Sequence, residues 1–450
     1  MNDTIVAIAT PKSESALSIV RISGEKSLDL CRDACKLPSP TPRHAYLTKY
    51  TSLQGDILDQ IILVYYESGK SFTSEHIIEI TCHGNPFIVK EIVNDLIDRG
   101  CRIANPGEFS YRAFKNNKID LTQAEAIAQL IGAKNKQALS LANKNLSGNL
   151  SERIINIQNK ILKQQSIIEA FIDFPEDDLG DDQKIQVIKN LKDLHIEIND
   201  LIVHAKKTDV FNRNLNVAII GPPNAGKSSI FNHIIGSERA IVDKEAGTTR
   251  DFIEKKIQLG CININLIDTA GIRNTEENIE KKGISKTIEL QRVADLVLLV
   301  FDCSLPFPEY LDTNLEHLIV NENVIIVLNK SDLGNNIEFS NIKFKENVKI
   351  KTSIKEIESL SLLQKAIEEN LVGESKSYTE LSLSVNLRQS HALENASHSL
   401  EECIFNLSKE SIELSIPELK DSIKYLGEIV GDTDNEDMLD VLFSNFCIGK

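Results

Sequence analysis

A chain of 450 residues is too long for a single hydrophobic core, because domains usually span about 100 to 200 residues, and two to four domains are expected. The 41% hydrophobic and 26% charged content excludes a wholly disordered protein. Acidic residues outnumber basic ones by 66 to 50, and the net charge of −16 argues against a surface that binds polyanions throughout. Any contact with nucleic acid must therefore use a local patch or a partner's surface.

The first 118 residues mix short apolar runs with turn residues. The runs "TIVAIAT", "LSIVRIS", "QIILVYY" and "HIIEIT" have the length and composition of strands. The start of the chain contains Asp3 and too short an apolar run for a signal peptide, and no stretch reaches the ~18 apolar residues of a membrane-spanning helix. We expect a small α+β domain over 1–118, no membrane association and a cytoplasmic location.

Helical periodicity follows, and it is interrupted once. Apolar residues recur at helical spacing from Leu121 to Phe174, and a further amphipathic stretch ends near residue 207. Helical spacing returns after residue 374. We therefore predict an all-α domain in two parts, 119–211 and 375–450, with a different domain inserted at 212–374.

The predicted insert alternates apolar strands with helices. Strands are expected at 215–220, 262–267, 296–301 and 324–328. This alternation is typical of a doubly wound parallel sheet.

A phosphate-binding motif opens the insert. The sequence "GPPNAGKS", Gly221 to Ser228, fits the P-loop pattern G-x-x-x-x-G-K-[ST] and stands between a predicted strand and a predicted helix. In that context backbone N–H groups point at phosphate. Lys227 is expected to reach the β- and γ-phosphates, and Ser228 to ligate Mg²⁺.

Three further segments occur in the order expected of a Ras-like GTPase. Asp268 in "DTAG" follows a strand and can hold Mg²⁺ through water, while Gly271 can sense the γ-phosphate. Asp332 in "NKSD" can accept two hydrogen bonds from the guanine edge, and adenine lacks that donor pair. "TSI", residues 352–354, would complete the base pocket. The predicted nucleotide is GTP.

The segment "EAGTTRD", residues 245–251, is predicted to be the switch. Its Thr249 is placed to close over Mg²⁺ while the γ-phosphate is present. Ras-like enzymes orient the attacking water with a glutamine directly after D-x-x-G, but Ile272 stands there. The charged stretch 272–285 offers several carboxylates, which can equally form a solvated helix face.

The chain ends in "SNFCIGK", in which Cys447 is the fourth residue from the end. A lipidation box fits poorly, because Gly449 and Lys450 break its pattern. Cys447 can also be a small apolar plug beside Phe446. The eight cysteines are scattered without a C-x-x-C pair, which is typical of reduced thiols.

The opening "DTIVAIATP", the helical domain split by a GTPase insert with "GTTRD", and the tail "FCIGK" together resemble the MnmE (TrmE) family of tRNA modification GTPases. The resemblance spans essentially the whole chain. It implies a homodimer that works with the flavoprotein MnmG, as a heterotetramer, on carbon 5 of the tRNA wobble uridine. The group installed would be aminomethyl or carboxymethylaminomethyl, with its one-carbon unit from 5,10-methylenetetrahydrofolate, for which 5-formyltetrahydrofolate is an analogue.

The same resemblance implies a folate site in the N-terminal domain, from Arg21, Glu79, Lys118 and Lys450. The cationic side chains suit the glutamate carboxylates of folate, and Glu79 suits the pterin N–H edge. Each residue taken alone is more simply a surface charge.

Catalytic and metal roles also come from the resemblance. It points to Glu280 for positioning water, to Arg250 as important in the switch, and to Cys447 as a catalytic or site-lining thiol. It assigns K⁺ to Asn224, Asp243, Glu245 and Thr248, and Mg²⁺ to Ser228 and Thr249. The family often has a less charged residue at position 245, which is harmless if only the carbonyl is used.

Motifs and resemblance together imply a set of nucleotide contacts along the insert. These are Asn224, Ala225, Gly226, Lys227, Ser228, Ser229, Asp243, Lys244, Glu245, Ala246, Gly247, Thr248, Thr249, Asp268, Thr269, Ala270, Gly271, Asn329, Lys330, Asp332, Ser353 and Ile354.

Two other functions stay open from sequence. A ribosome-assembly GTPase would use GTP as a timer, but such proteins usually carry a KH-type domain with a GXXG loop, and none is visible after residue 371. A stand-alone folate enzyme with a regulatory GTPase would transfer its one-carbon unit without a partner protein.

Overall fold

The computed structural model describes residues 3–173, 181–237, 253–268, 294–306, 323–334, 347–372, 383–409, 412–432 and 436–449. The chain divides into two compact units. The first contains Met1–Ile131, Asn145–Ile198 and His391–Lys450, and the second contains Gly132–Lys144 and Asn199–Ser390. The finer division into the four predicted segments stays a prediction.

The first unit contains a six-stranded sheet. Its spatial order is β3-β4-β5-β2-β1-β6. In chain order the strands are β1 (Ile5–Ile8), β2 (Leu17–Ser23), β3 (Ala45–Thr51), β4 (Ile57–Tyr66), β5 (Ile77–His83) and β6 (Arg102–Ile103). All pairings are antiparallel except the parallel pair β1 and β6. These strands confirm the α+β fold expected of this part of the chain.

Successive side chains along each strand point to opposite faces of this sheet. Residues such as Ile22, Leu63 and Ile80 are buried against α1 (Ser27–Cys35) and α2 (Pro86–Asp98). Arg21 and Glu79, which are direct partners in the β2–β5 register, lie on the opposite face. Helix α3 (Glu108–Lys115) packs Phe109 against Ile5 and Ala7 of β1 on that face.

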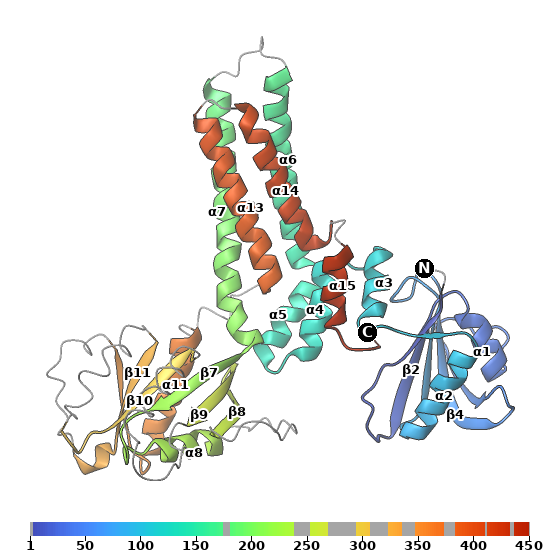
Figure 1. The fold of residues 1–450 in the computed structure, drawn as a ribbon, viewed down its shortest axis with the longest axis horizontal. Coiled ribbons are helices and arrows are strands. Elements are labelled where there is room, and N and C mark those ends of the chain that lie inside the picture. The colour runs from blue at the N-terminus through green and yellow to red at the C-terminus, as the bar shows by residue number, and fades with distance from the viewer. Residues whose placement is uncertain are drawn as a thin grey trace. The chain divides into compact units, whose positions relative to one another are not determined.

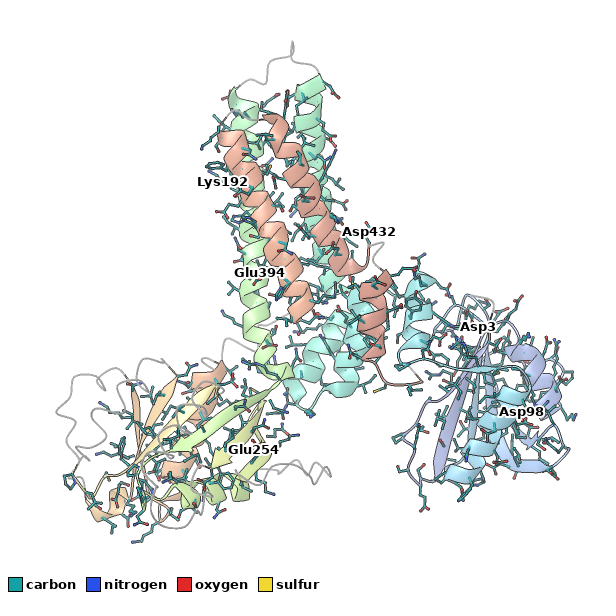
Figure 2. The ribbon with its side chains drawn as sticks, in the orientation of Figure 1. Asp3, Asp98, Lys192, Glu254, Glu394 and Asp432 are labelled. Carbon is teal, nitrogen blue, oxygen red and sulfur yellow. The ribbon has the colours of Figure 1, made fainter. Side chains whose placement is uncertain are left out.

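A buried ion-pair network fixes α3 to the start of the chain. Arg112 of α3 is 1% exposed and bonds Asp3, Glu75 and Glu108 at 2.7, 3.1 and 2.9 Å. Figure 2 labels Asp3 at the beginning of the N-terminal sheet, where Arg102 is a second partner at 2.7 Å. A buried arginine is stable only when its charge is compensated, and here three carboxylates do so.

The helical part of the first unit contains long helices, as Figure 1 shows. They are α4 (Leu121–Gly132), α6 (Asn149–Asp173), the first part of α7 (Asp181–Asn212), most of α13 (Leu387–Ser408), α14 (Ser415–Val430) and the shorter α15 (Glu436–Ser444). Gln158 of α6 donates to the carbonyl of Ile423 in α14, and Ser422 of α14 donates to Ala396 of α13. Helices formed by segments before and after the insert therefore pack together, which confirms the split all-α fold.

The second unit is an α/β sheet. Its spatial order is β12-β11-β10-β7-β9-β8. In chain order the strands are β7 (Asn214–Ile220), β8 (Ile253–Leu259), β9 (Ile262–Asp268), β10 (Leu296–Asp302), β11 (Val324–Asn329) and β12 (Val348–Thr352). Helices α8 (Lys227–Ser237), α11 (Ile357–Val372) and α5 (Lys136–Leu146) contribute to its core.

The four strands predicted in the insert are confirmed, and one departure from the predicted parallel sheet is found. β8 runs antiparallel to β9 at the edge, because only the two residues between them reverse the chain. The other five strands are parallel. Their carboxyl ends meet at one edge of the sheet, where ligands of doubly wound folds bind.

Candidate nucleotide-binding and N-terminal sites

The phosphate loop follows β7 and requires its glycines. Gly221 has φ +153°, and a Cβ there would lie 2.1 Å from the carbonyl oxygen of Val300. Gly226 has φ +94°, and its Cβ would lie 2.1 Å from the amide nitrogen of Asn329. Asn224, with φ +61°, adopts the left-handed conformation that asparagine tolerates. The chain can therefore pass close to the carboxyl ends of β10 and β11 before α8 begins.

Lys227 closes the loop from the first residue of α8. Its ammonium donates to the carbonyl oxygens of Gly221 and Pro222, each at 2.8 Å. Burial lowers the pKa of Lys227, while Asp268 acts in the opposite direction. A phosphate that accepts from this ammonium would restore the pKa, because a nearby anion favours the charged form.

Ser228 and Asp268 meet, although 40 residues separate them in sequence. The hydroxyl of Ser228 donates to the carboxylate of Asp268 at 3.0 Å. Asp268 ends β9 and is 2% exposed. Oxygen ligands of this kind are those that Mg²⁺ prefers, and Mg²⁺ often binds few protein groups beside nucleotide oxygens and water. The two residues therefore fit a magnesium ion that accompanies a nucleotide.

Asn329 links the predicted base pocket to the phosphate loop. Its side-chain amide donates to the carbonyl oxygen of Ala225 at 2.8 Å, and its own carbonyl accepts from the hydroxyl of Thr352 at 3.2 Å. Asn329 and Thr352 are both 0% exposed. The ends of β11 and β12 are thus fixed against the loop after β7.

Asp332 stands in a short 3-10 turn, Ser331–Leu333, after β11. One oxygen accepts from the hydroxyl of Ser353 at 2.8 Å, and the other pairs with Lys355 at 2.8 Å. Lys355 and Ser353 lower the pKa of Asp332, so the carboxylate is held in its ionised, accepting form. Ser353 is buried, whereas Ile354 and Ser229, in the first turn of α8, are exposed.

Sequence reasoning missed Asp302 at the end of β10. Its carboxylate pairs with Lys330 at 2.7 Å. The signal was present, because "LVLLVFD" places an acid at the end of an apolar strand just as "INLID" does for Asp268.

The N-terminal site centres on Arg21 and Glu79. Arg21 donates from Nε and a terminal nitrogen to the same oxygen of Glu79, at 2.9 and 2.7 Å. The hydroxyl of Tyr66 donates to the other oxygen at 3.2 Å, and the Arg21 guanidinium lies 5.7 Å from the ring centre of Phe109. A half-buried ion pair beside an aromatic ring suits a planar, polar ligand such as a pterin. Tyr66 was also not predicted from sequence.

The C-terminal tail reaches this ion pair. Arg21 donates to the carbonyl oxygen of Gly449 at 3.2 Å, across 428 residues of sequence. Gly449 has φ +91°, and a Cβ would lie 2.5 Å from the carbonyl oxygen of Ile8. The N–H of Gly107 donates to the carbonyl of Cys447 at 3.3 Å. The tail is therefore fixed to the N-terminal sheet.

Cys447 is exposed, whereas the other seven cysteines are buried or partly buried. Burial raises the pKa of Cys35 and of Cys403 to about 12, so those thiols stay protonated. Accessibility thus separates Cys447 from the rest. Lys118 is exposed, and its ammonium lies 3.4 Å from the carbonyl of Gly69, in the loop that follows Tyr66.

The remaining predicted site residues lie outside the described ranges. They are Asp243, Lys244, Glu245, Ala246, Gly247, Thr248, Thr249, Arg250, Thr269, Ala270, Gly271, Glu280 and Lys450. Within the described ranges no helix is long and apolar enough to cross a membrane.

Known proteins resemble the chain over its full length. Family models described as "GTP-binding protein TrmE N-terminus" and "MnmE helical domain" match residues 4–118 and 121–447. A tRNA modification GTPase MnmE from Aquifex aeolicus is 39% identical over 453 residues, covering 100% of both chains. The protein of that name from Sulfurimonas denitrificans is 35% identical, covering 100% of this chain and 99% of its own.

Among solved structures, the G domain of the T. maritima FeoB iron transporter aligns with 35% of this chain and 99% of its own, at 30% identity and a TM-score of 0.27. The full-length relatives and the two matching family models establish the family of this chain. The chain belongs to the tRNA modification GTPase MnmE family.

Proposed function

We propose that this GTPase couples GTP hydrolysis to modification of carbon 5 of the wobble uridine in tRNA. The observation that carries the nucleotide half of the proposal is the bond from buried Asn329 to Ala225, which joins the guanine motif to the phosphate loop. Asp332 then recognises the base, Lys227 the phosphates, and Ser228 with Asp268 the Mg²⁺ site. The tRNA half is supported by the printed names of the full-length relatives.

The N-terminal site would bind the tetrahydrofolate that donates the one-carbon unit. Arg21 and Glu79 supply a cation and a carboxylate on one sheet face, and Lys118 lies beside the loop after β4. Lys450 would add a cation at the end of the tail, which Arg21 holds through Gly449. Exposed Cys447 would line this site as a thiol available for reaction.

We further propose that the chain works as a cytoplasmic homodimer with the flavoprotein MnmG. Acidic residues exceed basic ones by 66 to 50, so a partner that supplies basic surface would help to hold the tRNA. In this proposal the acidic chain provides the nucleotide and folate sites, and its partner provides most of the contact with the polyanionic tRNA.

Hydrolysis would use K⁺ and Glu280. Asn224, Asp243, Glu245 and Thr248 would ligate K⁺ as two GTPase domains meet, and Glu280 would position the water, with Arg250 in the switch. Hydrolysis should then be faster in K⁺ than in Na⁺ at matched ionic strength, because the smaller ion fits such ligands poorly. Equal rates would count against the cation site, and full turnover by Glu280→Ala with normal GTP binding would count against that residue.

The deciding experiment is nucleoside mass analysis of tRNA incubated with purified protein, MnmG, GTP, K⁺, 5,10-methylenetetrahydrofolate and an amine donor. Ammonium would supply the nitrogen of an aminomethyl group, and glycine that of a carboxymethylaminomethyl group. We expect wobble uridine modified at carbon 5 only when all components are present. Modification without MnmG would favour a stand-alone folate enzyme. Normal wobble uridines in a strain that lacks this chain would favour a ribosome-assembly GTPase.

A further inference from the structure

Asp302 is a carboxylate at the sheet edge that carries the nucleotide site, and its position is fixed from two directions. One oxygen accepts from the N–H of Ser304 at 3.0 Å and from its hydroxyl at 2.6 Å. The other pairs with the ammonium of Lys330 at 2.7 Å. The Asp302 side chain is 11% exposed, so little water competes for these bonds.

Lys330 occupies a strained position between the two base-pocket residues. It follows Asn329, which holds the phosphate loop, and precedes the 3-10 turn that carries Asp332. Its φ of +60° is left-handed, a conformation that is unfavourable for a residue with a Cβ. Such strain persists only where neighbouring contacts over-determine the backbone.

Asp302 supplies one of those contacts through the side chain, and its neighbour supplies another through the backbone. Asp302 is the direct partner of Asn329 in the β10–β11 register, and the N–H of Cys303 donates to the carbonyl of Asn329 at 2.9 Å. The end of β10 therefore holds both the left-handed residue, Lys330, and the residue before it, Asn329. Burial raises the pKa of Asp302, but hydrogen bonds from Lys330 and Ser304 more than offset it, so the carboxylate stays ionised.

We propose that Asp302 is a positioning residue for guanine-nucleotide binding: its ion pair with Lys330 holds the left-handed turn that aims Asp332 at the base. The inference rests on the proposed nucleotide site and adds a residue to it. Because the pair acts on the base side of the pocket, its loss should weaken GDP and GTP alike. It should raise KM for GTP and leave kcat at saturating GTP nearly unchanged.

The test is a double-mutant cycle on the full-length protein, with fluorescent mant-GDP as the probe. Asp302→Ala and Lys330→Ala should each weaken binding roughly fivefold or more, since each removes a charge-assisted hydrogen bond. The double variant should bind no more weakly than Lys330→Ala, because the two residues act through one contact. Asp302→Asn keeps the shape of the side chain and tests the charge in a protein that still folds.

The chain offers a matched control at the other end of the same strand. Asp295 directly precedes β10, pairs with Arg213 at 2.9 Å and accepts from the N–H of Asn216 at 2.8 Å. Asp295→Ala removes an equivalent ion pair far along the strand from the carboxyl-end edge. We expect it to lower thermal stability while its mant-GDP affinity stays within about twofold of the wild type.

This role would be overturned if Asp302→Ala and Asp302→Asn bound mant-GDP as tightly as Asp295→Ala does. Independent, multiplicative losses in the double variant would overturn it as well, since Asp302 would then not act through Lys330. If the wild-type protein failed to bind mant-GDP, the proposed nucleotide site would fall together with this role. Wild-type binding with an unaffected Asp302 variant would reject this role alone.

Discussion

The side-chain amide of Asn329 donates a 2.8 Å hydrogen bond to the backbone carbonyl of Ala225 in the phosphate loop. Both residues are 0% exposed, so no water can replace the bond. The predicted base pocket and the phosphate loop thereby belong to one connected set of strand ends. A change on either side of this contact should affect binding of the whole nucleotide.

Gly226→Ala should abolish tight guanine-nucleotide binding. The new Cβ would lie 2.1 Å from the amide nitrogen of Asn329, and the backbone there has φ +94°. Overpacking of about 1 to 3 kcal/mol predicts roughly 5- to 150-fold weaker mant-GDP binding, measured by fluorescence titration.

Gly236→Ala, near the end of α8, is the matched control. Among the residues that the structure describes, none lies within 4 Å of a Cβ at Gly236, so the change should preserve affinity and stabilise α8 slightly, by about 0.5 to 1 kcal/mol. Equal affinity of both variants for mant-GDP would show that the loop does not need its glycine.

Ser228→Ala should raise the Mg²⁺ concentration that GTP hydrolysis requires. The hydroxyl lies 3.0 Å from the Asp268 carboxylate, and its loss removes one oxygen ligand. A titration of Mg²⁺ at fixed GTP should show half-maximal hydrolysis at a clearly higher concentration. Ser361→Ala, which removes an exposed hydroxyl from α11, should leave the titration unchanged. Coincident curves for the two variants would remove Ser228 from the metal site.

Arg21→Ala should weaken folate binding and release the tail. It removes both bonds to Glu79 and the bond to the carbonyl of Gly449. Charge-assisted hydrogen bonds of about 1.5 to 3 kcal/mol predict ~10- to 100-fold weaker binding of 5-formyltetrahydrofolate by calorimetry.

Arg32→Ala is the control for that change. Arg32 is exposed on α1 and pairs with Asp29 at 3.0 Å, on the helix-covered side of the same sheet. It should bind folate normally, and hydrogen exchange at residues 444–449 should rise only in Arg21→Ala. Normal exchange of the tail in Arg21→Ala would show that other contacts hold it.

Glu108→Gln should destabilise α3 at neutral pH and have little effect in acid. Burial alone would raise the pKa of Glu108. Hydrogen bonds from Arg102, from the backbone of Asn105 and from Arg112 lower it by more, so the pKa of Glu108 lies below its ordinary value. The stabilisation is therefore fully present above the unfolded pKa of about 4.5 and is lost as pH falls through the lower folded pKa.

The measurement is amide hydrogen exchange of α3 peptides in the full-length protein, corrected for intrinsic rates at each pH. The variant should exchange faster than the wild type at pH 7, by an amount equivalent to about 1 to 3 kcal/mol. The two proteins should converge below the folded pKa, where both side chains are neutral. A difference that stayed constant down to that pH would show that the charge of Glu108 is not what stabilises α3.

Sequence alone identified features that local patterns encode. The P-loop spacing placed Gly226, Lys227 and Ser228, and the acid that ends a buried strand placed Asp268. The same local signal marked Asp302, but without its partner it could not be distinguished from an ordinary strand end. The sequence pattern placed Arg21 and Glu79 on strands, but it did not indicate that they are direct partners in neighbouring strands.

What the sequence determined by itself was the set of periodicities and motifs: two helical segments, an inserted α/β sheet and a phosphate loop. The tertiary structure decided which distant groups meet: Asn329 with Ala225, Asp302 with Lys330, and Arg21 with Gly449. The physical reason is that helix and strand periods arise from neighbouring residues, whereas strand order and tail docking depend on burial across the whole chain.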